Sequence, residues 1–395
     1  MSTQQITPAR ADRITAEECR IDDFIALTDR TTDLADYPFA ASTERGVLFY
    51  DAAAVTGTDD RTRAQISDEL ARALLAGPGI VVFAGAFGDA HALRETTGVF
   101  SEIIADQHAA GMAGGDHFAK PGANDRIWNA LQKFAQRAPE LYSRYYANDV
   151  LALISEAWLG PMYQVTSQVN VVNPGGAAQN PHRDYHLGFM STDTAARFRA
   201  HIHRLSPALT LQGAVAHVDM PIESGPTMYL PYSQTYEPGY LAFNLPDFRE
   251  HFARNYVQLP LSAGDAVFFN PALFHGAGHN VSSDIRRMAN LLQISSAFGR
   301  AMDAVDRSAM LRALYPALRK LSATGDHRAV ANVIASAAEG YAFPTNLDID
   351  APITGLAGET QAELVARCLA GDVTAERFDA ELTALDTRHD PNGAH

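Results

Sequence analysis

Three side chains able to bind a divalent metal lie close together in the segment QNPHRDYHLGF: His182, Asp184 and His186. If the chain is extended after Pro181, His182 and Asp184 are two residues apart and lie on one face of a strand. One imidazole and one carboxylate on a face, completed by a distant second His, form the 2-His-1-carboxylate set that suits Fe(II) and leaves coordination positions open. The segment therefore indicates a candidate iron site.

The spacing alone does not select this segment, because His217 and Asp219 repeat it and a chain with 14 His is expected to contain such a pair by chance. The context favours the first copy. The segment GDAVFFNPALFHGAGHN supplies His275 near the end of a predicted strand, and Arg286 and Arg287 follow eleven and twelve residues later. A guanidinium binds a carboxylate through paired hydrogen bonds, which is what the far end of 2-oxoglutarate requires.

The stretch YQVTSQVNVV alternates polar and apolar side chains. A strand between a wet barrel interior and a hydrophobic layer has this pattern, and so has an ordinary strand with a solvated polar face. The polar positions are Gln164, Thr166, Gln168 and Asn170.

Short β-branched or alternating runs recur between residues 160 and 300, separated by turns such as NPGG, ESGP and SAGD. This pattern is typical of a β-sandwich or barrel. Apolar spacing predicts helices over 61–75, 92–104 and 139–159, and mainly helix after residue 300. We therefore predict an α+β protein with a mainly β core. Its expected parts are a loosely structured lead-in (1–60), a catalytic domain (61–300) and a helical extension packed on that domain (301–395).

The layout resembles the phytanoyl-CoA dioxygenase-like family of Fe(II)/2-oxoglutarate oxygenases over roughly residues 79–298. The resemblance rests on SQVNVVNPGGAAQNPHRD, VDMPIESGPTMYLPYSQ and GDAVFFNPALFHGAGHNVSSDIRR. It implies a double-stranded β-helix, a cupin-like jelly roll, flanked by N-terminal helices and a C-terminal helical extension. It also implies Fe(II) as the metal, with 2-oxoglutarate and molecular oxygen as co-substrates.

Carried over onto this sequence, the resemblance implies His182, Asp184 and His275 as iron ligands. It implies Arg286 as the anchor of 2-oxoglutarate, with Arg287 as the neighbouring alternative. The second copy of the H-x-D spacing falls on a strand where the family has no ligand.

The sequence departs from the family's pattern in two places. PYSQ stands at 231–234, where relatives commonly carry Pro-Gly-Ser-His, and the extra stretch TDTAARFRAHIHRLSPA precedes Thr210 as a candidate lid or partner surface. The carboxylate at Asp184 favours hydroxylation or another C–H oxidation over halogenation, because halogenating relatives have a small residue there.

Placement in this family also gives expectations for other polar residues. Thr166, Gln168 and Asn170 are expected to face the co-substrate or the substrate. His186 is expected to be a substrate contact or a spectator rather than a fourth ligand. Substrate contacts are also expected in the segment NDRIWNAL, for which the alternative is helix capping and core packing; its candidates are Arg126, Trp128 and Asn129.

The composition of the chain argues against some classes of binding partner. The net charge is −15 and no cluster of Lys and Arg is present, which argues against nucleic acid and anionic membrane surfaces. Two Cys far apart argue against a disulfide scaffold, and the polar start of the chain has no apolar leader, so we expect a cytoplasmic protein. Nothing in the sequence indicates an oligomeric state.

The predicted function is a Fe(II)/2-oxoglutarate-dependent dioxygenase that hydroxylates an unactivated C–H bond of a small metabolite or natural-product intermediate, releasing succinate and CO2. Desaturation, epimerisation or cyclisation would use the same residues. The alternatives are a cupin-like non-oxidative metalloenzyme and a non-catalytic barrel that binds a ligand.

Overall fold

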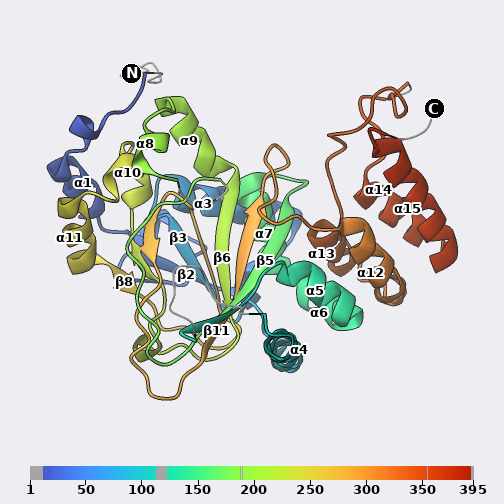
Figure 1. Cartoon of the computed structure of the whole chain (residues 1–395), viewed down its shortest axis with the longest axis horizontal. Helices are drawn as coiled ribbons and strands as arrows, with labels where there is room; N and C mark the ends of the chain where they lie inside the picture. Colours follow the sequence, from blue (N-terminus) through green and yellow to red (C-terminus); the bar gives the residue numbers. More distant parts are fainter. Residues whose placement is uncertain (1–11, 113–121, 187, 189, 354, 393–395) are drawn as a thin grey trace.

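The computed structural model describes residues 12–112, 122–186, 188, 190–353 and 355–392, and its described strands form two β-sheets (Figure 1). Residues 1–11 of the predicted lead-in lie outside this part. Among the described residues, the larger sheet has eight strands in the order β1-β2-β3-β9-β6-β11-β5-β4, and the smaller has three in the order β10-β7-β8.

The larger sheet is mixed, because β2 and β3 run parallel whereas the other neighbouring strands are antiparallel. Its strands are β1 (Ser42–Glu44), β2 (Val47–Asp51), β3 (Ile80–Ala84), β4 (Asn124–Ile127), β5 (Gln164–Val172), β6 (Thr210–Ala216), β9 (Ala266–Phe269) and β11 (Arg287–Ser295). The smaller sheet consists of β7 (Met228–Leu230), β8 (Val257–Gln258) and β10 (Phe274–Gly276).

Successive side chains of β5 point to opposite faces of the larger sheet, as the alternation in YQVTSQVNVV predicts. Val165, Val169 and Val171 are buried in the main hydrophobic cluster, which packs against helices. Gln168 and Asn170 lie on the other face and line a cavity. The strand therefore separates a dry helical layer from a polar interior.

The helical layer covers the outer face of the larger sheet. Its members are α3 (Asp60–Leu75), α4 (Ala90–Ala109), α5 (Ala130–Arg137), α6 (Pro139–Tyr146), α7 (Asp149–Leu159), α12 (Arg307–Ser322) and α13 (His327–Ala337). The predicted helix over 61–75 is α3. Its N-cap Asp59 accepts hydrogen bonds from two backbone N–H groups, and Ile66, Leu70 and Leu74 are buried at helical spacing.

The helix predicted over 139–159 is two helices, α6 and α7. The break occurs at Asn148, whose side chain accepts a hydrogen bond from the backbone N–H of Leu151 and so caps a new helix. Asn favours such caps because its short side chain competes for backbone groups in non-helical conformations.

The lead-in is more ordered than the sequence predicts. Residues 12–60 form α1 (Ile21–Thr28), α2 (Ala52–Val55) and the 3-10 turns Ala16–Glu18 and Leu34–Asp36, and they supply two strands to the larger sheet. Strand β2 joins because Val47, Leu48 and Tyr50 are buried beside β3. The three-part division of the chain stays a prediction.

Four further helices occur in segments for which the sequence indicated no regular structure. They are α8 (Thr192–Ala195), α9 (Ala200–Ala208), α10 (Gly239–Ala242) and α11 (Pro246–Asn255). Two 3-10 turns, Ile222–Ser224 and Ser233–Thr235, flank β7. Helices α8 and α10 have four residues each, which is too short to give a helical pattern. Helix α9 contains Pro207, a residue that the sequence pattern counts against a helix.

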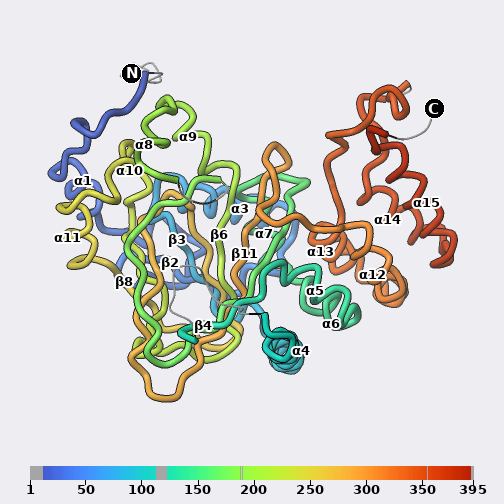
Figure 2. The backbone as a smooth tube through the Cα atoms, viewed as in Figure 1, coloured from blue at the N-terminus to red at the C-terminus, as the bar shows by residue number. Residues whose placement is uncertain are grey.

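After residue 300 the described chain is mainly helical, as the apolar spacing predicts, and α12 contacts α5 and α6. Arg307 at the start of α12 donates from Nη2 to the carbonyl oxygen of Val165 in β5 (3.0 Å). The last helices are α14 (Gln361–Ala370) and α15 (Ala375–His389), and Tyr315 of α12 stacks on Phe378 of α15 at 3.9 Å between ring centroids. Helix α1 near the start of the described chain and α15 near its end lie at opposite ends of the long axis (Figure 2).

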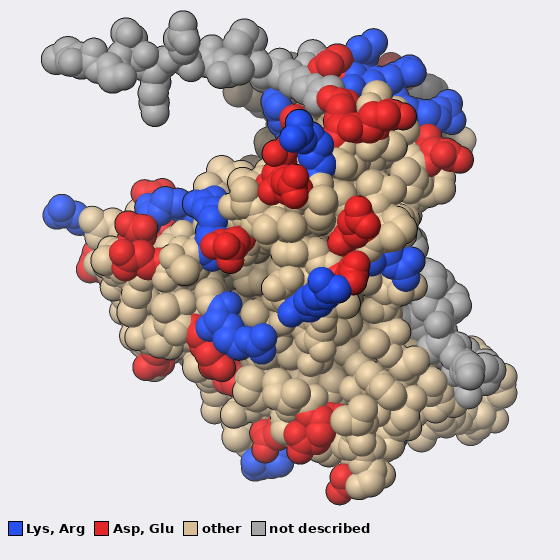
Figure 3. All heavy atoms as spheres, turned by 90° about the vertical axis from the view of Figure 1, so that its left-hand side faces the viewer, with Lys and Arg blue, Asp and Glu red and all other residues tan. Residues whose placement is uncertain are grey.

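On the side of the molecule that carries α1 and α11, basic and acidic side chains are interspersed (Figure 3). Some form local ion pairs, such as Arg20 with Asp23 and Arg254 with Glu250. Among the described helices, none is both long and apolar enough to cross a membrane.

Leu314→Ala should lower the free energy of unfolding by about 2–5 kcal/mol, because Leu314 is fully buried between α12 and its neighbours and the change leaves a cavity. Leu356→Ala is the matched control, since Leu356 is 98% exposed and its loss should change stability by less than about 0.5 kcal/mol. Urea denaturation followed by circular dichroism measures both. Equal effects would contradict the placement of α12 in the core.

Candidate metal centre

The inner faces of the two sheets enclose a cavity of about 270 Å³. The larger sheet contributes Gln168, Gln212 and Leu291 to its lining, and the smaller sheet contributes Tyr229 and His275. His182 and Asp184 reach it from the segment between β5 and α8.

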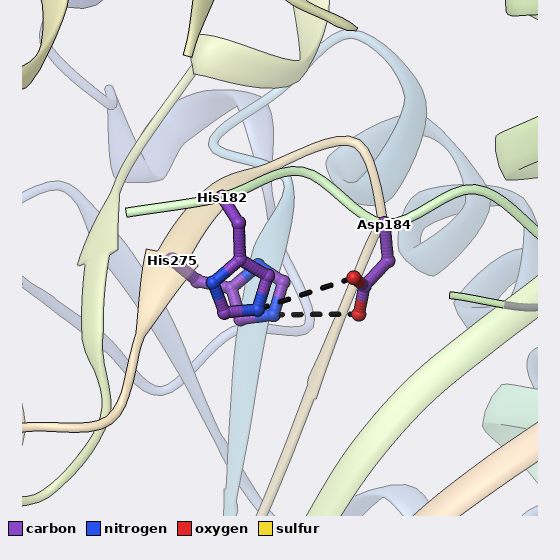
Figure 4. Close-up of side chains that lie close together, drawn as sticks. All are labelled: His182, Asp184 and His275. Atoms are coloured by element: carbon purple, nitrogen blue, oxygen red, sulfur yellow. Dashed lines mark ion pairs between the residues drawn. The ribbon is translucent and has the colours of Figure 1, made fainter. Parts of the chain in front are cut away.

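His182, Asp184 and His275 meet in this cavity (Figure 4). One ligand atom from each lies within 4.8 Å of the others. The Nε2 atom of His182 is 3.9 Å from Oδ1 of Asp184, and the Nε2 atom of His275 is 3.8 Å from Oδ2. Both imidazoles therefore turn the same ring nitrogen toward one carboxylate.

Backbone contacts fix which nitrogen each imidazole offers. The Nδ1 atom of His275 lies 2.9 Å from the carbonyl oxygen of Leu273, and that of His182 lies 3.1 Å from the carbonyl oxygen of Asn180. A carbonyl can only accept, so Nδ1 carries the proton and Nε2 keeps its lone pair in the neutral ring. Such outer contacts are typical of metal-binding His.

The carboxylate of Asp184 is held in place and one of its oxygens is left over. Gln212 donates from Nε2 to Oδ2 at 2.5 Å, and the backbone N–H of Asp184 donates to Pro271. Within the described part of the chain, the buried Oδ1 atom has no hydrogen-bond partner. A buried carboxylate oxygen without a partner is costly unless a cation binds it. The three side chains thus fit a divalent metal in donor type and orientation.

Burial, with a smaller contribution from the neighbouring His182, lowers the pKa of His275 to about 4, while Asp184 acts in the opposite direction. The ring is therefore neutral at physiological pH. A neutral imidazole is the form that binds a metal.

The structure brings Arg287, not Arg286, into the cavity. Arg287 is 6% exposed, lines the cavity and donates from Nη1 to the carbonyl oxygen of Ser224 (3.2 Å). Burial lowers its pKa to about 10, so it stays charged at neutral pH. The Arg286 side chain is 60% exposed outside the cavity, where it pairs with Asp125 (3.0 Å) and contacts Asn173 (3.1 Å).

The expected inward-facing residues of β5 divide in two. Gln168 and Asn170 line the cavity. Thr166 is buried but is not part of the lining, and its Oγ1 atom donates to the carbonyl oxygen of Gln293 on β11 (2.8 Å). Thr166 therefore links two strands.

Of the residues in NDRIWNAL, Arg126 and Trp128 line the cavity and Asn129 does not. The Arg126 guanidinium lies over the Trp128 ring, 4.2 Å from its centroid, and donates to Oε1 of Gln168. Asn129 stands before α5 with φ of 49° and donates from Nδ2 to Gln132 and to the Ala304 carbonyl oxygen.

His186 is also absent from the cavity lining. Its Nδ1 atom lies 2.6 Å from Oγ1 of Thr210, and its backbone N–H donates to Ser206. The ring packs against Gly299, where a Cβ atom would stand 2.7 Å from Nε2. Burial lowers the pKa of His186. His186 therefore links α9, through Ser206, to the segment that follows β11.

His217 of the second H-x-D copy is a buried core residue, as the context of the sequence favours. Its Nδ1 atom contacts Oγ1 of Thr97 (2.9 Å) and its Nε2 atom contacts the hydroxyl of Tyr145 (3.0 Å). Asp219 accepts a hydrogen bond from the backbone N–H of Ala263 instead of joining a metal group.

Gln212 holds Asp184, although its spacing in the sequence did not mark it as a site residue. The signal was a polar side chain in the apolar strand TLQGAVA, on the face opposite Leu211 and Val215.

The comparison with known families agrees with this geometry. The family described as "Phytanoyl-CoA dioxygenase (PhyH)" matches residues 79–288, more than half of the chain. The chain belongs to the phytanoyl-CoA dioxygenase family. The cofactors of this family are Fe(II), 2-oxoglutarate and molecular oxygen, and the His-Asp-His group provides donors suited to the iron.

Individual relatives are more distant. The dioxygenase trt7 of Aspergillus terreus (strain NIH 2624 / FGSC A1156) is 31% identical over 121 residues, which cover 31% of this chain and only 37% of that protein. The structure of the non-heme alpha ketoglutarate dependent epimerase SnoN from nogalamycin biosynthesis is 20% identical, with a TM-score of 0.42, covering 60% of this chain and 82% of that one. AviO1 from Streptomyces viridochromogenes Tue57 is 17% identical, with a TM-score of 0.43, covering 59% and 97%.

Stability should fall as the pH drops below about 6.5, partly because of His217. Burial lowers the pKa of His217 to about 3. Below pH 6.5 the unfolded chain therefore binds a proton at this ring, whereas the folded chain keeps the ring neutral. Between the pKa of His217 in the unfolded chain and that in the folded chain, this residue should lower the free energy of unfolding by about 1.4 kcal/mol for each pH unit of acidification.

His217→Gln should reduce the slope of unfolding free energy against pH, measured by urea denaturation at several pH values between 6.5 and 4.5. The exposed His201 gives the control His201→Gln, which should keep the wild-type slope. An unchanged slope in the His217 variant would contradict the prediction.

Proposed function

We propose that the chain is a Fe(II)- and 2-oxoglutarate-dependent dioxygenase that hydroxylates an unactivated C–H bond of a small metabolite or natural-product intermediate, with release of succinate and CO2. The observation that carries the proposal is the buried group of His182, Asp184 and His275, opening into a cavity that also contains the Arg287 guanidinium.

The proposed roles follow from the chemistry of the side chains. His182, Asp184 and His275 would hold Fe(II) through Nε2, a carboxylate oxygen and Nε2. Arg287 replaces Arg286 as the proposed anchor, because it presents a charged fork inside the cavity where a carboxylate can accept two hydrogen bonds. Bound iron and 2-oxoglutarate supply oxygen activation coupled to oxidative decarboxylation of the co-substrate.

The protein's own contribution is binding, orientation and exclusion of water. Leu259, Val267 and Phe269 line the same cavity as Arg287 and would give the co-substrate an apolar surround. A dry wall strengthens the attraction between the guanidinium and a carboxylate, since little water screens it.

We infer that the two sheets are the two faces of a double-stranded β-helix. Support comes from their arrangement, because the cavity lies between them and receives side chains from both, such as Gln212 from the larger sheet and Tyr229 from the smaller. Ligands in such barrels enter between the strands at one end.

The substrate would enter along the side of the cavity formed by Arg126, Trp128, Gln168 and Met302. An indole face with a guanidinium stacked on it provides apolar contact and hydrogen-bond donors at one place. Since Met302 lies between β11 and α12, the start of the C-terminal extension would contribute to substrate binding.

His182→Ala and Asp184→Ala should abolish Fe(II)-dependent release of succinate from 2-oxoglutarate, because each removes a ligand that no nearby side chain replaces among the described residues. His201→Ala, at an exposed position of α9, is the control and should retain turnover. The assay measures succinate with and without candidate substrates. Turnover independent of 2-oxoglutarate would favour the cupin-like alternative, and failure to bind metal would favour the binding protein.

Arg287→Gln should raise the KM for 2-oxoglutarate by roughly 10- to 100-fold, because it removes a charged hydrogen-bonded contact to the co-substrate. Arg286→Gln makes the same chemical change one residue away, outside the cavity, and should leave this KM near the wild-type value. Initial rates at varied 2-oxoglutarate concentration compare the two variants. A larger effect from Arg286→Gln would return the anchor to that position.

A further inference from the structure

Between the two proposed ligands His182 and Asp184 stands Arg183, whose side chain takes the opposite direction. It is 2% exposed and is among the largest fully buried side chains of the chain. Residues on either side of it face the cavity, so the extended backbone sends Arg183 behind the metal centre. A buried guanidinium is expensive unless its donors are satisfied.

The donors of Arg183 reach two different segments. Its Nε atom donates to the carbonyl oxygen of Ala272, and its Nη2 atom donates to the carbonyl oxygen of Ser233 at 2.6 Å. Its charge also lies over two aromatic rings, 4.9 Å from the centroid of Tyr240 and 5.6 Å from that of Phe274.

Both segments lead directly to His275. Ala272 precedes Leu273, whose carbonyl oxygen fixes the proton on Nδ1 of His275. Ser233 accepts through Oγ a hydrogen bond from the backbone N–H of Phe274, at 2.8 Å. The guanidinium is therefore bound on both sides of the short stretch that aims His275 at the cavity.

The Tyr240 ring that packs on Arg183 also holds the other side of the centre. Its hydroxyl donates to the backbone carbonyl oxygen of Asp184 at 2.9 Å. Because the backbone N–H of Asp184 is already bound to Pro271, both backbone groups of this ligand are fixed by contacts around the guanidinium.

We propose that Arg183 is a positioning residue of the metal centre, a buried clamp that sets the separation of His182 and Asp184 from His275. The inference rests on the proposed function, since it concerns the same ligands. Arginine suits this role because its rigid planar fork reaches two carbonyl oxygens at fixed angles, which the single ammonium of lysine does not reproduce.

Arg183→Lys should keep the fold and weaken metal binding. Co(II) serves as a spectroscopic probe for the Fe(II) site, and titration of the apoprotein gives its Kd and its d–d absorption bands without turnover. Loss of an outer contact should raise the Kd by about 10- to 100-fold and alter the bands. Circular dichroism and thermal melting follow the fold of the same samples.

Arg307→Lys is the matched control. Arg307 is also a buried arginine that donates to two backbone carbonyl oxygens, those of Ser336 and Val165, but it lies in the helical layer. The change should lower the melting temperature while the Co(II) Kd stays within about twofold of wild type, because distant sites act independently.

Gly239→Ala displaces the guanidinium without removing it. A Cβ atom at Gly239 would stand 2.2 Å from Cζ of Arg183. The residue begins α10, where alanine is otherwise favourable. The expected result is a folded protein with a loss of Co(II) affinity smaller than that of Arg183→Lys.

The outcomes of these titrations separate a failure of the proposed function from a failure of the positioning role. A wild-type protein that binds neither Co(II) nor Fe(II) contradicts the proposed function itself. If wild type binds Co(II) and both Arg183→Lys and Gly239→Ala match its Kd and spectrum, the positioning role is overturned. It is also overturned if neither variant folds, or if Arg307→Lys loses as much affinity, since Arg183 would then act on stability alone.

Discussion

Two backbone hydrogen bonds between His182 and His275 are the constraint on which the rest of the centre depends. The N–H of each residue donates to the carbonyl oxygen of the other, at 2.9 and 3.1 Å. This antiparallel bridge joins residues more than ninety positions apart in the sequence. It holds their rings 4.4 Å apart and leaves Asp184, two residues on, to close the group from the third side.

The larger sheet separates the cavity next to this bridge from the hydrophobic core, because its two faces are chemically different. One face carries Val, Leu, Ile and Phe side chains against the helical layer, and the other carries amides and Arg287 into the cavity. The period of two in a strand is enough to build both faces from one sequence. The helical layer supplies the hydrophobic stability, and the inner face is therefore available for polar groups that bind small molecules.

The stretch 192–208, predicted from the sequence to be a lid or partner surface, packs next to the candidate metal centre. Tyr185 stacks on Tyr240 with ring centroids 3.9 Å apart, and its hydroxyl contacts Nδ1 of His203 in α9 at 2.9 Å. Tyr240 in turn holds the Asp184 backbone. The insertion and α10 thus pack as one layer behind the ligands, which is a structural role for residues considered as a lid.

Residue type and short spacing were enough to predict the types of the candidate ligands, the alternation of β5, the main helices and the neighbourhood of the proposed co-substrate anchor. Sequence alone did not separate Arg286 from Arg287, since only the pairing of Arg287 with Val172 shows that β11 begins at Arg287 and leaves Arg286 outside the sheet. It also gave no sign of how Gln212 or Arg183 acts. Their partners lie on segments far along the chain, and only the packing of two sheets brings those segments together.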